Sequence, residues 1–389
     1  MDAATPQEEQ QKRWRHNSPA LYDMAVVHRL AWPSLTVQWL RGARLLLATF
    51  TSGAEPEHVL VARADVPRAA ETGFVDAAAA DDGAALDDTR WAQLRTDAAV
   101  VVEQRVPHER EANRARAMPQ DEHTIATRGP TASGGGAVFV HRLCPADAGK
   151  ATTTATTTKL PGPCVDGTPL SWAPTAAGTL AGGDNDGHIA VWDAAAGALV
   201  HGVCQAAPRG VTVEDVRFHP GSDALLVSVD DAGALQVWDT RTAMAAPALR
   251  HAAAHGAGCE VNGVAVCAGS GVVLATAGAD CCARVWDLRA LADGRGAVRV
   301  LAGAHREQLL QAEWCPQRAG VLATASTDAA VVLWDVTAAA DDDAVLFRHC
   351  GHAAAVTDLC WSPEEPWTVA SVSEDNDLQL WRVAQHLRW

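Results

Sequence analysis

Tryptophan residues recur along this chain at a nearly constant spacing. Five of them, each ending a short apolar run, stand at positions 192, 238, 286, 334 and 381, so that neighbours are 46, 48, 48 and 47 residues apart. Twenty residues before each of them stands a residue that opens a strand: Trp172, Phe218, Val266, Trp314 and Trp361. Such a chain does not divide freely into unrelated domains, because every unit must build the same supersecondary structure and bury its faces against its neighbours.

A repeat length in the forties is typical of β-propellers built from WD repeats, in which each repeat supplies one four-stranded blade. The runs that end in tryptophan predict inner strands that are packed on both faces. Weaker copies of the pattern lie at residues 45–62 and 118–140, which brings the number of blades to seven. We therefore expect an all-β fold, a seven-bladed WD-repeat β-propeller with an N-terminal α-helix and a short C-terminal helix.

The chain ends set the boundaries of this propeller. Residues 1–33 are expected to form the N-terminal helix and its lead-in, because residues 6–28 are rich in Gln, Glu, Lys and Arg, with an interruption near Pro19. Residues 34–384 are expected to form the propeller, and residues 385–389 a remnant of a C-terminal helix. The last blade needs a fourth strand, and residues 34–40 are predicted to supply it, which joins the chain ends and removes an open sheet edge.

Charge and cysteine content narrow the choice of partners. The formal net charge is −16, which disfavours direct nucleic-acid binding and favours a basic partner, because a phosphate-binding surface needs many Lys and Arg side chains. The ten cysteines include no C-x-x-C pair, which indicates a reducing compartment. No apolar run approaches the roughly 18 residues of a membrane span. We expect a protein that does not enter membranes and that is monomeric on its own.

A further set of residues is predicted to be structural. In four blades an aspartate stands six residues before the closing tryptophan, and in one blade it stands seven residues before. Aspartate suits a tight turn, because its carboxylate accepts hydrogen bonds from nearby backbone N–H groups. In WD repeats this aspartate also tends to join a tryptophan, a hydroxyl and a histidine in a buried network. The predicted structural set is Asp186, Trp192, Asp231, Trp238, Asp280, Trp286, His305, Asp328, Trp334, His352, Asp375 and Trp381.

The sequence favours no catalytic or metal-binding reading of its reactive residues. The string from His349 to His352 lacks a second pair of metal ligands. Cys281 and Cys282 are strand neighbours that point to opposite faces, without a basic setting that would activate a thiolate. A propeller enzyme would also need a nucleophile and base pair, which is not evident. We expect no enzymatic activity, no cofactor and no metal.

Three longer strings carry more information than a generic repeat. They are residues 17–23 followed by residues 32–40, residues 108–120, and residues 365–367 leading into residues 371–376. In these strings the chain resembles the nuclear histone-binding WD-repeat family, which comprises the small retinoblastoma-binding and chromatin assembly factor chaperone subunits. The resemblance runs from about Trp14 to about Leu387, interrupted by Ala-rich and Thr-rich loops.

The resemblance implies a non-catalytic histone-binding scaffold or chaperone. Members of the family serve in chromatin assembly, acetyltransferase, deacetylase and Polycomb-type complexes, and they bind the third and fourth core histones. It also implies a nuclear location, with the cytoplasm as a second one. The tail-binding residues carried over to the top face are His58, Glu111, Asn113, Arg114, Asp166, Glu214, Asn262, Glu374 and Asn376. The side groove for a histone helix would comprise Leu21, Asp341, Asp342, Asp343, Leu346 and Phe347.

The chain departs from the family pattern in both places. On the top face, Thr168 and Leu310 replace a Tyr and a Phe that normally flank an inserted arginine, and Gln308 replaces a Glu. Loss of cation–π stacking of that kind costs on the order of 0.5–2 kcal/mol. At the groove, the acidic loop is short and lacks paired prolines, and Ala20 replaces a bulky aromatic. These changes predict weaker tail binding and a shallower groove.

An adaptor of another class remains as the alternative function, either a ubiquitin-ligase substrate receptor or an assembly factor. Such receptors usually carry an arginine three residues after a closing tryptophan, where it docks a helical adaptor. This chain has that pattern twice, at Arg241 and Arg289. Fold alone does not distinguish the two classes.

Overall fold

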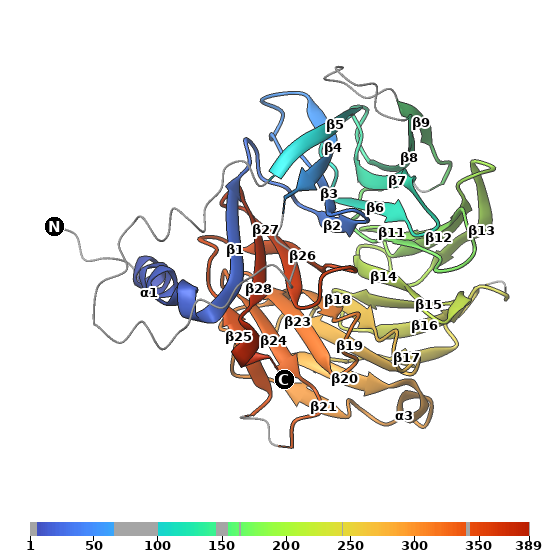
Figure 1. The fold of residues 1–389 in the computed structure, drawn as a ribbon. Helices are drawn as coiled ribbons and strands as arrows, with labels where there is room; N and C mark the ends of the chain where they lie inside the picture. Colours follow the sequence, from blue (N-terminus) through green and yellow to red (C-terminus); the bar gives the residue numbers. More distant parts are fainter. Residues whose placement is uncertain are drawn as a thin grey trace, which may run out of the picture.

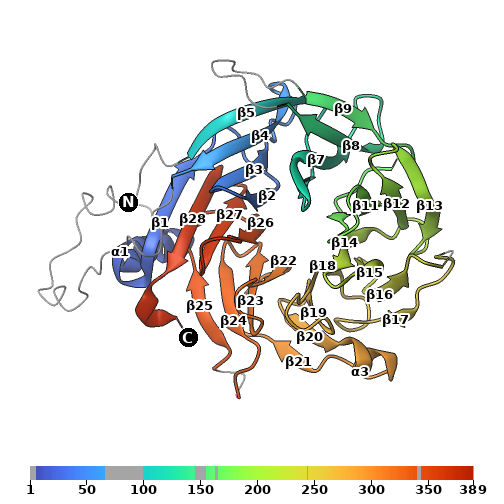
Figure 2. The same ribbon diagram turned by 45° about the vertical axis from the view of Figure 1, so that its right-hand side comes forward.

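The computed structural model describes residues 6–65, 100–144, 155–162, 165–242, 244–339 and 343–388. In these residues the strands form seven four-stranded antiparallel sheets. The sheets stand side by side around a central axis, as Figures 1 and 2 show. The expected seven-bladed propeller is therefore confirmed.

Each blade runs from an innermost to an outermost strand. The first two blades consist of β2 (Val37–Leu40), β3 (Arg44–Ala48), β4 (Glu57–Ala64) and β5 (Val100–His108), and of β6 (Arg114–Met118), β7 (Asp121–Pro130), β8 (Gly136–Leu143) and β9 (Ala155–Lys159). The next two consist of β10 (Leu170–Trp172), β11 (Thr179–Gly183), β12 (His188–Asp193) and β13 (Ala198–Gln205), and of β14 (Val213–His219), β15 (Ser222–Asp230), β16 (Leu235–Asp239) and β17 (Leu249–His251).

The remaining blades follow the same order. They consist of β18 (Val261–Val266), β19 (Val273–Gly278), β20 (Ala283–Asp287) and β21 (Arg299–Leu301), of β22 (Leu309–Trp314), β23 (Val321–Ser326), β24 (Val331–Asp335) and β25 (Val345–His349), and of β26 (Val356–Trp361), β27 (Thr368–Ser373), β28 (Asp377–Val383) and β1 (Tyr22–Arg29). Among the described residues, the helices that flank the strands are α1 (Pro6–Leu21), the short α3 (Leu288–Ala292) and a C-terminal 3-10 helix (Gln385–Leu387). No helix in the described part of the chain has the length and apolarity to cross a membrane.

The closing tryptophans lie where the repeat places them, in the third strand of each of their blades. In the third blade, Trp172 of β10 pairs with Leu180 of β11, which pairs in turn with Trp192 of β12. All five closing tryptophans are at most 2% exposed. The constant spacing of twenty residues is thus the length of one chain excursion from the first strand of a blade to its third.

The strand that closes the ring differs from the prediction. The fourth strand of the last blade is β1, which pairs antiparallel with β28, with Val26 opposite Leu380. Residues 34–40 were expected in that place, but β2 forms the innermost strand of the first blade instead. The prediction was wrong because residues 22–29 were assigned to a continued helix. Their side chains are buried from Tyr22 to Val27, apart from Asp23, which suits a strand packed on both faces.

The N-terminal helix ends at Leu21, two residues after Pro19, and is anchored to the last blade. Trp14 on α1 donates its indole N–H to the Tyr22 hydroxyl at 2.7 Å, and that hydroxyl lies 2.8 Å from Nδ1 of His349. The His349 ring stacks on Trp381, with ring centroids 4.4 Å apart. Helix α1 is therefore fixed against the outer strands of the last two blades.

Candidate functional site

All nine predicted top-face residues lie at one end of the blades, which we call the upper rim. In a four-stranded antiparallel blade, the first strand begins and the second ends at the same edge, where the third begins and the fourth ends. Glu111, Asn113 and Asp166 directly precede innermost strands, Arg114, Glu214 and Asn262 lie at the start of innermost strands, His58 lies at the start of β4, and Glu374 and Asn376 lie in the turn between β27 and β28. The topology thus brings residues from six blades to one edge.

Two of these residues touch across neighbouring blades. The Asn113 side-chain amide donates to Oδ1 of Asp166 at 3.2 Å and to the carbonyl oxygen of Gly167 at 3.2 Å. Asp166 also accepts from the backbone N–H of Gly167 at 2.8 Å. Its carboxylate is therefore held in one orientation by the protein before any ligand arrives, which favours recognition of a cationic group.

Glu214 is the centre of an acidic cluster on the rim. Its half-buried carboxyl faces Asp231 and Glu260, with Asp215 and Asp230 farther inside. Burial, followed by repulsion from these carboxylates, raises the pKa of Glu214 to about 7. A proton or a cationic ligand relieves this repulsion, so the cluster favours a guanidinium or an ammonium group over water.

A stability measurement can test this electrostatic state. Above pH 7 the folded chain holds an ionised Glu214 at a cost, whereas its usual pKa in the unfolded chain is near 4.5. Folding therefore retains a proton between these values, and stability falls as pH rises from about 4.5 to 7. We expect Glu214→Gln to stabilise the fold by about 1–3 kcal/mol at pH 8 and by much less at pH 5. Urea unfolding of both proteins at the two pH values checks this, and an equal difference at both would contradict it.

Glu111 lies in a second acidic part of the rim. A cavity of ≈ 430 Å³ is lined by residues 53–57, residues 108–111 and Ala132, and it includes Glu55, Glu57, Glu109 and Glu111. Glu57 is only 5% exposed because its carboxylate accepts from Thr49 and from Thr51. Glu55, Glu109 and Glu111 remain open to solvent or partly so. This cavity can receive a basic side chain at the edge of the first two blades.

The other predicted rim residues differ in how accessible they are. Arg114 is turned into the central channel, where its side chain is 6% exposed and pairs with Asp358 at 3.0 Å. The Asn262 amide already donates to the carbonyl oxygen of Leu309 at 2.8 Å. Glu374 is exposed, while His58 and Asn376 are half-buried. The structure therefore offers carboxylates for ligand contact, and it uses Arg114 inside the protein.

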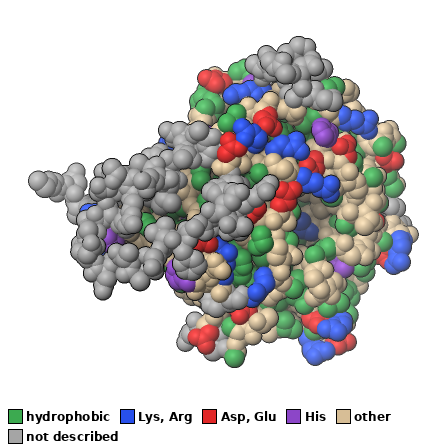
Figure 3. Space-filling view, viewed as in Figure 1, with side chains coloured by type: hydrophobic (Ala, Val, Ile, Leu, Met, Phe, Trp, Pro, Cys, Tyr) green, Lys and Arg blue, Asp and Glu red, His purple; other side chains and the backbone are tan. Residues whose placement is uncertain are grey.

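Surface charge over the molecule is mixed. In the view of Figure 3, Lys and Arg side chains lie among Asp and Glu side chains over the upper part of the molecule. The net charge of −16 is therefore not spread as a uniform acidic coat. Local clusters such as that around Glu214 determine where a basic ligand is held.

The predicted histidines lie in complete buried networks. In the sixth blade, His305 contacts Asp328 at 3.2 Å and Thr324 at 2.8 Å, and Thr324 accepts from Trp334 at 2.8 Å. In the last blade, His352 lies 2.8 Å from Ser371, which accepts from Trp381 at 3.3 Å, and 3.6 Å from Asp375.

Sequence reasoning missed the equivalent network in the fifth blade, which joins His255, Asp280, Thr276 and Trp286. His255 stands 31 residues before its tryptophan, whereas His305 and His352 stand 29 before theirs. A search at one fixed offset therefore does not find it.

Two of the predicted turn aspartates have different neighbours from those expected. In the third blade, the turn N–H groups of residues 186 and 188 donate to Asp184, which is fully buried, while Asp186 accepts from Gly210 at 3.0 Å. In the fourth blade, Asp230 accepts from Ala234 at 2.7 Å, and Asp231 faces Glu214 instead. The reason is that these blades place the aspartate eight residues before the tryptophan.

The side groove lies where α1 meets the outer strand β25. Leu21 at the end of α1 and Leu346 in β25 are only partly buried, and both pack against the core that contains Phe347 and Tyr22. Phe347 itself is 7% exposed, so it supports the wall from inside. Asp343 is exposed at the end of the preceding loop, whereas Asp341 and Asp342 lie outside the described residues.

The arginines of the adaptor pattern are exposed on the other end of the blades. The side chains of Arg241 and Arg289 are each 75% exposed. Each pairs at 2.6 Å with the aspartate two residues before it, Asp239 and Asp287. Their guanidinium groups therefore already have a carboxylate partner within the same turn.

The rim residues that sequence reasoning missed include Glu260. It stands six residues before Val266, the same offset that Asp166 has from Trp172 in its own opening strand. Applying that offset to every blade would have found it. In the described part of the chain, no group of three or more His, Cys, Asp or Glu side chains is arranged to hold a metal ion.

Comparison with known protein families adds information on two parts of the chain. Residues 9–68 match the family described as the histone-binding protein RBBP4 or the equivalent component of the CAF1 complex. Residues 249–287 and 344–382 each match the WD domain, G-beta repeat. The first match includes α1 and the strands β1 to β4, and the other two fall in the fifth and seventh blades.

Proposed function

Because the chain belongs to the RBBP4-like WD-repeat family of histone-binding proteins, we propose that it is a non-catalytic scaffold or chaperone subunit of nuclear chromatin complexes. In this proposal the upper rim binds basic histone tails, and the side groove binds a histone helix. Its partners would be the third and fourth core histones and larger chromatin assembly or chromatin-modifying complexes.

The observation that carries the proposal is the coincidence of the family match with α1 and its anchor. The matched residues 9–68 contain Trp14 and Tyr22, which hold α1 against His349. This packing leaves Leu21 and Leu346 partly exposed beside each other's elements, at a seam between a helix and a strand edge. An amphipathic helix binds such a seam through apolar anchors, while its basic residues meet nearby carboxylates such as Asp343.

The upper rim supports tail binding by a different physical argument. A histone tail presents arginine and lysine side chains, and charge-assisted hydrogen bonds to fixed carboxylates are stronger than those between neutral groups. Asp166 is fixed by Asn113, and Glu214 lies among other acids. A cation at Glu214 would displace its proton, so tail binding is proposed to strengthen as pH rises through about 7.

The two surfaces can be tested together with two peptides, the tail of the third core histone and the first helix of the fourth. We expect Glu214→Lys to weaken tail binding at least tenfold at low salt and to leave helix binding unchanged, because it places a like charge in the acidic cluster. We expect Leu346→Asp to do the reverse, because it puts a carboxylate in the apolar wall. Calorimetric titration measures both affinities.

Matched variants control for general damage. Val300 in β21 is 42% exposed on the equivalent outer strand of another blade, so Val300→Asp should alter neither affinity. Asp293 is an exposed acid away from the rim, and Asp293→Lys should leave tail binding intact. If the folded wild type bound neither peptide at low salt, histone binding by these surfaces would be ruled out.

A further inference from the structure

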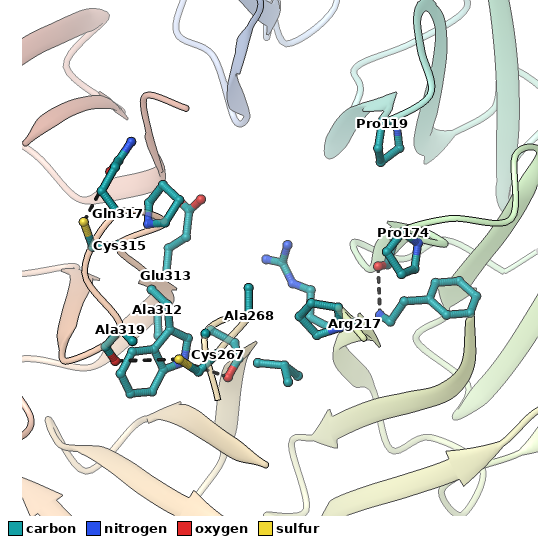
Figure 4. Close-up of a pocket in the computed structure, with 18 of the residues that line it drawn as sticks. Pro119, Pro174, Arg217, Cys267, Ala268, Ala312, Glu313, Cys315, Gln317 and Ala319 are labelled. Carbon is teal, nitrogen blue, oxygen red and sulfur yellow. Dashed lines mark hydrogen bonds between the residues drawn. The ribbon is translucent and has the colours of Figure 1, made fainter. Parts of the chain in front are cut away.

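The central channel opens at the end opposite the upper rim into a cavity of ≈ 530 Å³, which we call the lower mouth. Its wall comes mainly from the turns between the first and second strands of the blades and is largely apolar, with Pro174, Pro220, Ala268 and Trp314 among its residues. Two ionisable side chains, Arg217 of β14 and Glu313 of β22, also line it. Figure 4 shows both of them projecting from the walls toward the central space.

Arg217 has hydrogen-bonding capacity to spare. Its Nε donates to Oδ2 of Asp215 at 3.0 Å. The nearby Gln311 amide is best satisfied when its oxygen accepts from Arg114 at 3.0 Å, which turns its nitrogen toward Arg217. In that arrangement, no acceptor for Nη1 and Nη2 of Arg217 is found among the described residues. The side chain is 27% exposed although it lies on an innermost strand, because it faces the cavity.

The surrounding channel carries an excess of positive charge. Three guanidiniums, of Arg114, Arg116 and Arg217, interact with two carboxylates, of Asp215 and Asp358, which leaves 3 − 2 = +1. Glu313 does not cancel this charge, because burial, and then Asp358 against the opposing effect of Arg217, raises its pKa to about 8. At neutral pH it is a neutral carboxyl group that can donate a hydrogen bond.

We propose that the lower mouth is a binding site for a carboxylate group carried on a small apolar body. The carboxylate would accept from Nη1 and Nη2 of Arg217 and from the carboxyl of Glu313, while the body would pack against the proline and alanine wall. A cation would be repelled by Arg217. A doubly charged phosphate would exceed the single positive charge available, and a lone inorganic ion would leave the apolar wall uncovered.

Two sources could supply this chemistry, a small organic acid or the C-terminus of a polypeptide. We would titrate the full chain with N-acetyl-L-leucine and with N-acetyl-L-leucinamide, and separately with a five-residue alanine peptide ending in leucine, as free acid and as amide. At least one free acid is expected to bind, and its amide at least tenfold more weakly, because the amide lacks the charge that pairs with Arg217. Whichever acid binds more tightly identifies the source.

Variants separate this site from the fold and from the upper rim. Arg217→Gln should weaken binding of the acid at least tenfold, and so should Arg217→Gln combined with Asp215→Asn, which leaves no unpaired carboxylate behind. Arg241→Gln, a solvent-exposed change on the same end of the blades, should not affect it. Tail-peptide binding at the upper rim should persist in all of these variants, so failure of the rim proposal and failure of this one are distinguishable.

The pH dependence provides an independent readout. The charged and titratable groups that face Glu313 are Arg116 on β6, Arg217 on β14, Asp358 and Cys360 on β26, and Cys315 after β22. Ionisation of Glu313 removes the donor and adds repulsion, so binding should weaken as pH rises through about 8. Glu313→Gln keeps a neutral donor and should bind the acid without that decline. The proposal is overturned if acid and amide bind equally, if Arg217→Gln binds like the wild type, or if no acid binds at about 10 mM.

Discussion

Removal of residues 1–29, so that the chain begins at Leu30, is expected to abolish cooperative folding of the propeller. This change deletes β1, and with it the buried side chains of Tyr22, Met24 and Val26. Each such side chain contributes about 1.5–3 kcal/mol. Their sum, with the lost ladder to β28, is comparable with the entire stability of a typical protein, about 5–15 kcal/mol. Thermal and urea unfolding followed by circular dichroism measure the loss.

The same deletion exposes β28 as an edge strand, so the product is expected to aggregate. Addition of a peptide that spans residues 6–29 should restore a folded complex, because the closing strand then pairs with β28 in trans. Arg29→Ala is the control, since it removes an exposed ion pair with Asp377 on the same strand and should cost less than about 1 kcal/mol. A shortened chain that remains monomeric and unfolds like the full chain would show that β1 is dispensable.

The second large effect is expected at Asp358 in the channel. Its carboxylate, 1% exposed, pairs with Arg114 at 3.0 Å and with Arg116 at 3.1 Å, and it accepts from the backbone N–H of Val37 at 2.9 Å. It thereby links innermost strands of three blades. Burial alone would raise the pKa of Asp358, but Arg116 and Arg114 lower it below its usual value. The group is therefore ionised at neutral pH.

We expect Asp358→Ala to destabilise the protein by about 3–5 kcal/mol, because it leaves two buried guanidiniums without their counter-charge. Urea unfolding at pH 7 gives the difference in free energy. Asp293→Ala removes an ion pair whose side chains are 63% and 70% exposed, and it should change stability by less than about 1 kcal/mol. Equal effects of the two substitutions would refute a special role for the channel network.

The comparison of sequence with structure shows which inferences depend on local pattern. The spacing from Trp172 to Trp192 reports a chain excursion within one blade, and so the blades follow from the sequence. The upper rim also follows, because an offset counted from the opening strand places Glu111, Asp166 and Glu214 at the same edge of different blades. The histidine networks were found where the offset was constant and missed at His255, where the loop is two residues longer.

Inferences that depend on distant partners could not be drawn in this way. The sequence did not show that the Arg114 guanidinium would turn inward to Asp358, because that contact joins strands of different blades. It also did not reveal that Glu214 and Glu313 hold protons near neutral pH. Those states depend on burial and on carboxylates from other segments of the chain.

The sequence by itself determined the number of blades, their strand order and the family to which the chain belongs, because these are encoded in local spacing and in contiguous strings. Only the tertiary structure decided which segment closes the ring. Residues 22–29 and 34–40 both read as apolar strands, and the choice between them rests on pairing with β28, about 350 residues away in sequence. Long-range packing and charge pairing, which no local pattern encodes, also fixed the channel network and the protonation of its acids.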